Sequence, residues 1–317
     1  MNATCRIALL TSFLLFCPAG LAQNEYRVPA NPDVVSLLTA NQVPQIKYNG
    51  KAARIAFIHR ETLVPVERIS QTHLGLAGFW FDPRIRASGY DSRVERVVVL
   101  DGRTGVTLTV WEPEGEPALD YIEFSPDGRY LSAVSYRGQH PWLALFEIAS
   151  GREQLLPVAV NPAFGAPCQW DDSLSLLCRL IPDEEAAPPA PFASPNLIDH
   201  PGGSARTRTY RNLLDNAWEE AAFEYYFSST LARVGINGKV HRYEATSGLL
   251  ARVRPSPDGK YALLVRLQRP YSHLLKASHF PRDFEIWDLQ SGERLETPYL
   301  LQQKDITPTK GVGLPGF

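Results

Sequence analysis

The sequence predicts an all-β fold of repeated four-stranded units, and three observations lead to this prediction. Two nearly identical segments, FSPDGRYL at 124–131 and PSPDGKYALL at 255–264, each place a tight turn before a strand pattern. Their serines, Ser125 and Ser256, lie 131 residues apart, about three times the roughly 40–45 residues of a propeller blade. Long helical periodicity is almost absent from the chain. We therefore predict a partial β-propeller of about four to five blades.

Each copy of the turn has the residues that tight turns favour. Ser opens the turn, Pro presets φ at the next position, Asp suits the third, and Gly takes the left-handed exit. Each copy is later followed by an apolar strand that runs into a glycine turn, LALFEIASGRE ending at Glu153 and FEIWDLQSGER ending at Arg294. The repeat therefore includes both turn and strand.

The first 22 residues have the pattern of a secretory signal peptide. Arg6 precedes an apolar run at 7–16, and small residues lead to a cleavage site at Ala22. A buried first strand or helix is the alternative, but nothing polar interrupts the run. A lipoprotein would be acylated at Cys17, yet Phe16 is bulky where a small residue is expected. We expect residues 1–22 to be removed and the mature chain to be secreted or periplasmic.

Charge and hydropathy limit the partners. The formal net charge of −2 becomes one unit more negative when Arg6 leaves with the signal. A nucleic-acid-binding protein would show a basic face, so we expect no nucleic acid partner. No stretch after the signal approaches the roughly 18 apolar residues of a transmembrane helix, so we expect no membrane span in the mature chain.

After an irregular, proline-spaced lead at 23–44, short strands alternate with turn residues, and we expect blades over 45–300 and an irregular tail at 301–317. About sixteen candidate strands make about four blades of four strands each. Clear examples lie at 53–58, 94–100, 106–111, and between 119 and 148. The strand at 106–111 pairs with the one before it across DGRTG, a hairpin connection.

An insertion at 182–228 interrupts this pattern. Residues 182–203 are rich in Pro, Ala and acidic residues and predict an exposed connector. In the segment 209–227, apolar residues recur at helical spacing, which predicts a short helical insertion. A second interruption at 269–283 lengthens the hairpin of the last predicted blade. Insertions in a propeller project from a rim or into the channel mouth, where ligands lie.

Two cysteines remain after the signal, Cys168 and Cys178, and they flank a predicted hairpin that turns at 171–173. They are candidates for a disulfide in an oxidising compartment. A tight turn would place them offset rather than opposite each other. Two buried free thiols therefore remain the alternative.

The sequence shows no motif for a catalytic site, a metal or a cofactor, and we expect none of the three in this chain. It has no Gly-x-Ser-x-Gly, no His-Glu-x-x-His, no Cys-x-x-Cys and no phosphate-binding glycine loop. The only close histidine pair outside the first blades is His273 and His279, and surface loops explain it better than a nucleophile and base.

Glu219 and Glu220, in the predicted helical insertion, are the candidate substrate-binding residues. Two carboxylates that face a cavity can hold a peptide amine or a basic side chain by charge-assisted hydrogen bonds. A solvated helix face is the alternative, and Arg206 and Arg208 just upstream are available as partners.

Two blocks of the chain resemble a known family. ARTRTYRNLLDNAWEEAAFEYYFSSTLARV at 205–234 and VRPSPDGKYALLVRLQRPYSHLLKASHFPRDFEIWDLQSG at 253–292 are similar to the propeller of bacterial and plastid glutamyl endopeptidase-like enzymes. These are members of the prolyl oligopeptidase family of serine peptidases. HLGLAGFWFDPR at 73–84 and the segment 168–191 also fit, and the resemblance extends from about Tyr26 to Thr297.

The resemblance implies that a propeller caps an α/β-hydrolase domain with a Ser-Asp-His triad, admitting peptides and excluding folded proteins. It ends before the later blades and the hydrolase domain, so no triad residue carries over to this chain. It therefore implies a gating and peptide-positioning part that is inactive alone. This part is a gene fragment, a frameshifted product, or a subunit that a partner polypeptide with the hydrolase domain would complete. In the dipeptidyl-peptidase branch, paired glutamates on a propeller helix bind substrate amino termini, and Trp218-Glu219-Glu220 is loosely similar. A standalone periplasmic interaction module is the alternative function.

Overall fold

The computed structural model describes residues 31–40, 42–113, 115, 118–138, 140–183 and 210–301, with only the backbone described at 296–301. The chain forms two compact units, Met1–Ala40 and Asn41–Phe317. The predicted signal peptide, most of the connector at 182–203 and nearly all of the predicted tail lie outside the described residues.

The described part of the first unit is the helix α1 (Pro32–Leu38). It lies in the segment 23–44 that we expected to be irregular, so that expectation is wrong at these residues. The side chain of Asn31 caps the helix by accepting a hydrogen bond from the Asp33 amide at 2.9 Å, and Pro32 occupies the first turn. Proline is favourable there because its missing N–H needs no partner. A helix of 7 residues, about two turns, is too short to show helical periodicity in the sequence.

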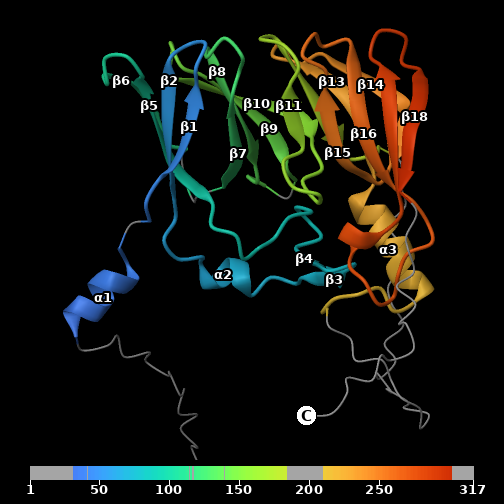
Figure 1. The fold of residues 1–317 in the computed structure, drawn as a ribbon. Helices are drawn as coiled ribbons and strands as arrows, with labels where there is room; N and C mark the ends of the chain where they lie inside the picture. The colour runs from blue at the N-terminus through green and yellow to red at the C-terminus, as the bar shows by residue number, and fades with distance from the viewer. Residues whose placement is uncertain are drawn as a thin grey trace, which may run out of the picture. The chain divides into compact units, whose positions relative to one another are not determined.

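The described residues of the second unit contain four consecutive antiparallel meanders, each of four strands (Figure 1). The first is β1 (Gln45–Asn49), β2 (Arg54–Arg60), β5 (Val94–Asp101) and β6 (Thr107–Trp111). The second is β7 (Leu119–Phe124), β8 (Tyr130–Ser135), β9 (Trp142–Glu147) and β10 (Arg152–Ala159). The third is β11 (Cys168–Trp170), β12 (Ser175–Leu180), β13 (Ser229–Gly235) and β14 (Val240–Gly248). The fourth is β15 (Leu250–Pro255), β16 (Tyr261–Leu267), β17 (Arg282–Asp288) and β18 (Arg294–Leu301).

The strand pairing between the first and second meanders is a single residue pair, Val94 of β5 with Leu119 of β7. The described sheets do not close into a ring. The predicted fold class, an all-β partial propeller of four-stranded blades with a helical insertion, is therefore confirmed.

The repeated turn has the same hydrogen bonds in both copies. In the first, Ser125 Oγ donates to Asp127 Oδ1 at 2.7 Å and accepts from the Tyr130 amide at 2.9 Å, and Gly128 has a φ of +68°. The second copy, at Ser256, repeats each of these contacts. The serine hydroxyl thus satisfies the amide of the residue that starts the next strand.

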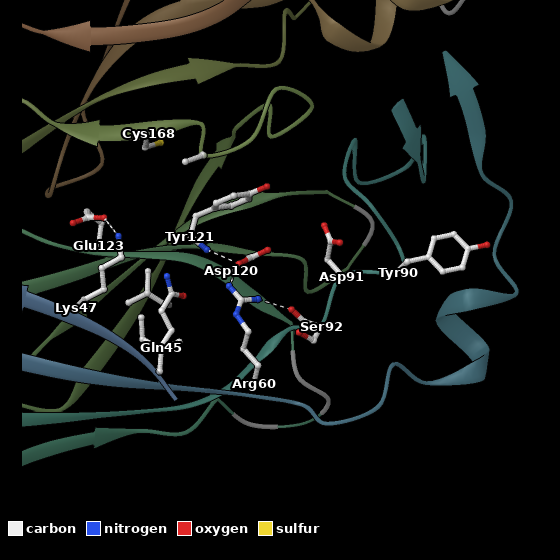
Figure 2. A pocket seen from close by; sticks show the side chains of 13 residues that line it. Gln45, Lys47, Arg60, Tyr90, Asp91, Ser92, Asp120, Tyr121, Glu123 and Cys168 are labelled. Carbon is white, nitrogen blue, oxygen red and sulfur yellow. Dashed lines mark hydrogen bonds and ion pairs between the residues drawn. The ribbon is translucent and has the colours of Figure 1, made fainter. Parts of the chain in front are cut away.

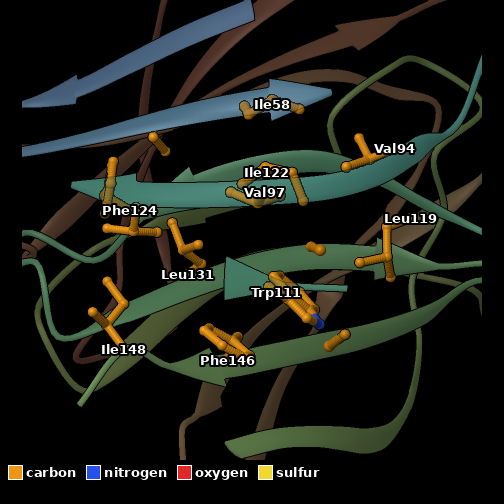
Figure 3. Packing of buried hydrophobic residues seen from close by; sticks show 14 residues of the cluster. Ile58, Val94, Val97, Trp111, Leu119, Ile122, Phe124, Leu131, Phe146 and Ile148 are labelled. Atoms are coloured by element: carbon orange, nitrogen blue, oxygen red, sulfur yellow. The ribbon is translucent and has the colours of Figure 1, made fainter. Parts of the chain in front are cut away.

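The cores lie between neighbouring sheets. Figure 3 shows the cluster between the first two meanders, where Val97 and Trp111 of the first pack on Leu131 and Phe146 of the second. The Trp111 and Phe146 rings are stacked with centroids 4.9 Å apart. Similar clusters join the second meander to the third and the third to the fourth. Face-to-face packing of successive meanders is the packing of propeller blades.

A fourth cluster joins the insertions to one another. The hairpin of β3 (Leu74–Leu76) and β4 (Phe79–Phe81) packs with α3 (Ala217–Phe227) and with the one-turn η1 (Ala277–His279). The short helix α2 (Val66–Ile69) precedes the hairpin. Figure 1 shows α3 and the β3–β4 hairpin at the same end of the sheets.

The helix in the insertion is shorter than the predicted segment 209–227. It begins at Ala217, with Asn216 as its N-cap. Asn212 has a φ of +56°, a left-handed conformation that a helix cannot contain. Leu213 and Leu214 lie in the irregular segment before the helix and are buried. They are apolar because they are buried, as the residues on the buried face of a helix would be.

Candidate functional site

A cavity of about 540 Å³ lies where the first strands of three meanders approach one another (Figure 2). These strands are β1, β7 and β11, joined by the end of β2 and the loop at 90–92. The lining residues are Gln45, Lys47, Ile58, Arg60, Tyr90, Asp91, Ser92, Asp120, Tyr121, Ile122, Glu123, Ala166 and Cys168. Polar and charged side chains from separate parts of the sequence dominate this lining.

The floor of the cavity is an ionic network centred on Asp120. Arg60 Nη2 lies 2.7 Å from Asp120 Oδ1, and Arg93 Nη1 lies 3.2 Å from Oδ2. Arg60 also donates to the Ser92 carbonyl at 2.5 Å. Asp120 and Arg93 are almost fully buried, and the Arg93 guanidinium lies over the Tyr136 ring, 4.0 Å from its centroid. A buried carboxylate that is hydrogen-bonded to a buried and a half-buried arginine fixes its neighbours in position.

Tyr121 has a left-handed backbone in the middle of a strand. Its φ is +55°, and β7 carries one extra residue relative to β8 between Asp120 and Glu123. Such a β-bulge re-aims a side chain. A left-handed conformation costs a bulky residue about 1–2 kcal/mol. The Asp120 carboxylate accepts a hydrogen bond from the Tyr121 amide at 2.9 Å, so the buried network helps to hold this conformation.

The Tyr121 ring projects into the cavity on the side of Asp91 (Figure 2). Burial, and next the negative charge of Asp120, raise the pKa of the Tyr121 hydroxyl. The hydroxyl is therefore neutral in the physiological range, where it both donates and accepts hydrogen bonds.

The charged groups of the lining differ in their partners. Lys47 Nζ lies 2.5 Å from Glu123 Oε2, and Arg60 pairs with Asp120. For Asp91, the structure records no hydrogen bond or ion pair of the carboxylate with any described residue; only its backbone carbonyl accepts one, from Arg68. The cavity thus contains two neutralised pairs and a carboxylate that points into the space between Tyr121 and Tyr90 (Figure 2).

The lining has the character of a binding site. Its described lining residues include Ser92 but no histidine, so none of them is a nucleophile beside an imidazole base. Among the described residues, no group of three or more His, Cys, Asp or Glu side chains is placed to hold a metal ion. In the same part of the chain, no helix has the length and apolar character to cross a membrane.

The structure places the two predicted substrate-binding residues at the start of α3. The Asn216 side chain accepts from the Glu219 amide at 3.0 Å, while Glu219 Oε2 accepts from the Asp215 amide at 2.5 Å. This arrangement resembles a capping box, except that Glu219 accepts from the amide of the residue before the N-cap. Glu220 Oε1 lies 2.9 Å from His273 Nε2, and Oε2 lies 2.6 Å from Arg269 Nη1. Neither residue lines the cavity.

Glu220 and Glu224 connect α3 to the segment after β16. Arg269 Nε lies 2.7 Å from Glu224 Oε1, and Tyr271 donates to the same oxygen at 2.6 Å. Hydrogen bonds from His273 and Arg269 lower the pKa of Glu220. The role of Glu219 and Glu220 in binding peptide amines stays a prediction, and Glu220 would have to exchange these partners to perform it.

The structure joins Cys168 and Cys178 by a disulfide, with Cα atoms 4.1 Å apart. They are directly opposite in register, as are Trp170 and Leu176. The offset expected for a tight turn does not occur, because an odd number of residues, 171–175, separates the last cross-strand pair, Trp170 and Leu176. Cys168 lines the cavity, so the disulfide lies in its wall.

The sequence did not single out Asp91, Asp120 or Tyr121. One signal was available: in LDYIEF, Asp120 is a charged residue directly between Leu119 and Tyr121 in a predicted strand. Buried charge in a strand indicates a network or a site. The left-handed Tyr121 has no sequence signal, since Gly or Asn would be expected there.

Similarity searches connect the chain to known peptidases. The chain is 25% identical over 279 residues to a probable chloroplastic glutamyl endopeptidase of Arabidopsis thaliana, covering 83% of this chain and 29% of the relative. It is 26% identical over 284 residues to a protein of the same name from Oryza sativa subsp. japonica, covering 83% and 30%. The predicted resemblance to the glutamyl endopeptidase-like branch is confirmed. The chain spans less than a third of the length of these relatives.

Solved structures with a similar arrangement include Pyrococcus horikoshii acylaminoacyl peptidase, with a TM-score of 0.45 and 10% identity, covering 83% of this chain and 33% of that chain. The β-propeller domain of the Trilobed protease from Pyrococcus furiosus gives a TM-score of 0.43 and 8% identity, covering 82% and 58%. No family model matches the chain.

Proposed function

We propose that this chain is the propeller portion of an exported serine peptidase of the prolyl oligopeptidase family. In this role it controls the access of peptides to the active site of an α/β-hydrolase domain and positions them there. The observation that carries the proposal is a polar cavity at the first strands of three meanders, in a chain similar to probable glutamyl endopeptidases. The cavity has binding groups in its lining and no nucleophile with a histidine base.

The face of the first meander that is not packed on the second meander favours the proposal that this chain is part of a larger assembly. Ile46, Phe57, Val98 and Val110 are cross-strand partners in turn, so they form one apolar row on a single face. Ile46 is 60% exposed and Val110 45% exposed. The apolar row of the second meander that includes Phe146 is buried against the first meander. An exposed row of this kind fits a further β-sheet, supplied by the polypeptide that carries the hydrolase domain.

A peptidase assay tests the non-catalytic role. The purified full chain is incubated with fluorogenic peptides containing Glu or Pro, with and without a serine-directed phosphonate, beside a known serine peptidase as positive control. We expect no turnover by this chain under either condition. Turnover that the phosphonate abolishes would contradict the proposal.

Size-exclusion chromatography separates this function from the standalone periplasmic module. The exposed apolar row should make the isolated chain self-associate, because uncovered sheet faces and edges promote contacts between copies. A compact, soluble monomer over a wide concentration range would instead favour the standalone module.

Export is part of the proposal and has its own test. Cleavage after Ala22 should leave a protein that begins at Gln23 outside the cytoplasm. N-terminal sequencing of the fractionated protein measures this directly. Retention of the uncleaved chain in the cytoplasm would contradict export.

A further inference from the structure

The cavity combines three features that together define a ligand chemistry. Its two cationic side chains, Lys47 and Arg60, are each held by an acid of the same lining. The Asp91 carboxylate faces the open space with no partner recorded among the described residues. A carboxylate at a partly enclosed cavity wall favours a ligand that brings both positive charge and N–H donors.

Tyr121 supplies the second feature. Its hydroxyl projects toward the same space as Asp91, and a strained backbone inside a bulge sets that direction. Left-handed non-glycine residues persist where their surroundings hold them in place, and they cluster at ligand-binding sites. Here the restraint comes from Asp120, which binds the Tyr121 amide while both of its oxygens are held by arginines.

Tyr90 supplies the third feature. Its ring lies beside His73, with centroids 4.9 Å apart, and 45% of the residue remains exposed at the cavity. Figure 2 shows Asp91 between Tyr90 and Tyr121. The Tyr90 ring extends away from Asp91 on the side opposite Tyr121, so it bounds the far edge of this space, where it can contact the aliphatic chain that carries a cation.

We propose that Asp91, Tyr90 and Tyr121 form a binding subsite for a cationic nitrogen group of a peptide, either a basic side chain or the free amino terminus. Asp91 accepts the charged N–H groups, the Tyr121 hydroxyl accepts a further hydrogen bond, and the Tyr121 and Tyr90 side chains bound the space for the attached carbons. This subsite rests on the proposed peptide-positioning function and specifies which peptides the cavity prefers. It is separate from Glu219 and Glu220, which lie outside the cavity lining.

The test measures binding of four peptides of one length to the full chain by fluorescence anisotropy. The peptides carry Lys or norleucine at a central position, each with a free or an acetylated amino terminus. The full chain is compared with Asp91→Asn and Tyr121→Phe. The matched control is Glu95→Gln, a carboxylate-to-amide change at an exposed β5 residue outside the lining.

We expect the cationic peptides to bind more tightly than the acetylated norleucine peptide. Asp91→Asn should weaken only the cationic peptides, by about tenfold or more, as expected for a hydrogen bond to a charged group. Tyr121→Phe should weaken them by a smaller factor, and Glu95→Gln should leave all affinities unchanged. Added salt should weaken the binding of the cationic peptides to the native chain and reduce the effect of Asp91→Asn, because it screens the charge interaction.

The peptide set identifies which peptide group supplies the cation. It also distinguishes failure of the proposed subsite from failure of the proposed peptide-positioning function. Loss of binding on acetylation assigns the subsite to the amino terminus, while loss on replacing Lys assigns it to a side chain. Equal affinity for all four peptides, unaffected by Asp91→Asn, would overturn the subsite and leave peptide positioning intact. Absence of binding by every peptide would overturn both.

Discussion

Two networks in this molecule each place one carboxylate between two basic side chains, but their surroundings differ. On β7, Asp120 binds Arg60 and Arg93; on α3, Glu220 binds Arg269 and His273. In the first network the Asp120 and Arg93 side chains are 8% and 2% exposed. In the second, Arg269 and His273 are 54% and 45% exposed.

This difference in burial indicates which network contributes more to the stability of the fold. Removing one member of a buried network leaves uncompensated charges in a poorly solvated site, whereas water replaces the lost partner at an exposed pair. The Asp120 network should therefore hold the residues of the cavity in fixed positions and contribute strongly to global stability. The α3 network should hold α3 against the segment 269–273, with little effect on global stability.

The largest expected effect comes from Asp120→Asn. The change preserves side-chain shape but removes the charge between two arginines, so we expect a loss of about 3–5 kcal/mol in the free energy of unfolding. Urea denaturation followed by tryptophan fluorescence measures it. Glu220→Gln is the matched control and should cost less than about 1 kcal/mol. Similar losses for both variants would remove the distinction between the two networks.

The disulfide in the cavity wall should have an intermediate effect. Replacing Cys168 and Cys178 together by serine removes a cross-link between residues ten apart in sequence. We expect a loss of about 3 kcal/mol, mainly because the unfolded chain gains freedom. Denaturation in reducing buffer serves as the control, since reduction should bring the native protein close to the variant. A native protein that does not respond to reductant would contradict a stabilising disulfide.

The smallest effect concerns pH and the α3 network. Because hydrogen bonds from His273 and Arg269 lower the pKa of Glu220 below its ordinary 4.5, its stabilising contribution is complete above that pH. The contribution is lost as the pH falls through the lowered folded-state pKa. Unfolding measured from pH 6 to pH 3 should show the native protein losing stability below pH 4.5 more steeply than Glu220→Gln. Parallel curves would show that the pair contributes nothing.

Much of the fold could be predicted because its determinants are local. The serine, proline, aspartate and glycine of the repeated turn act within a few residues, and both copies form the expected hydrogen bonds at Ser125 and Ser256. The helix of the insertion was predicted too long because Leu213 and Leu214 are buried from an irregular segment. Apolar spacing alone does not distinguish that segment from a helix.

The site escaped prediction because its determinants are distant in sequence. Arg60 and Asp120 meet only through the strand order, and Glu220 meets Arg269 across 49 residues. The register of Cys168 and Cys178 depends on whether the hairpin loop has an odd or even number of residues. The conformation of Tyr121 is imposed by its buried neighbours rather than by its own preference.

We propose that peptides bind at the first strands of the meanders rather than at α3. Hydrogen exchange of the chain with and without a bound peptide distinguishes these two places. We expect a peptide with a free amino terminus and a central Lys to slow the exchange of the backbone amides at 90–92 and 119–124. Amides of α3 and of the segment 269–273 should exchange at unchanged rates. Protection confined to Ala217–Phe227 and 269–273, with none at 119–124, would contradict the claim.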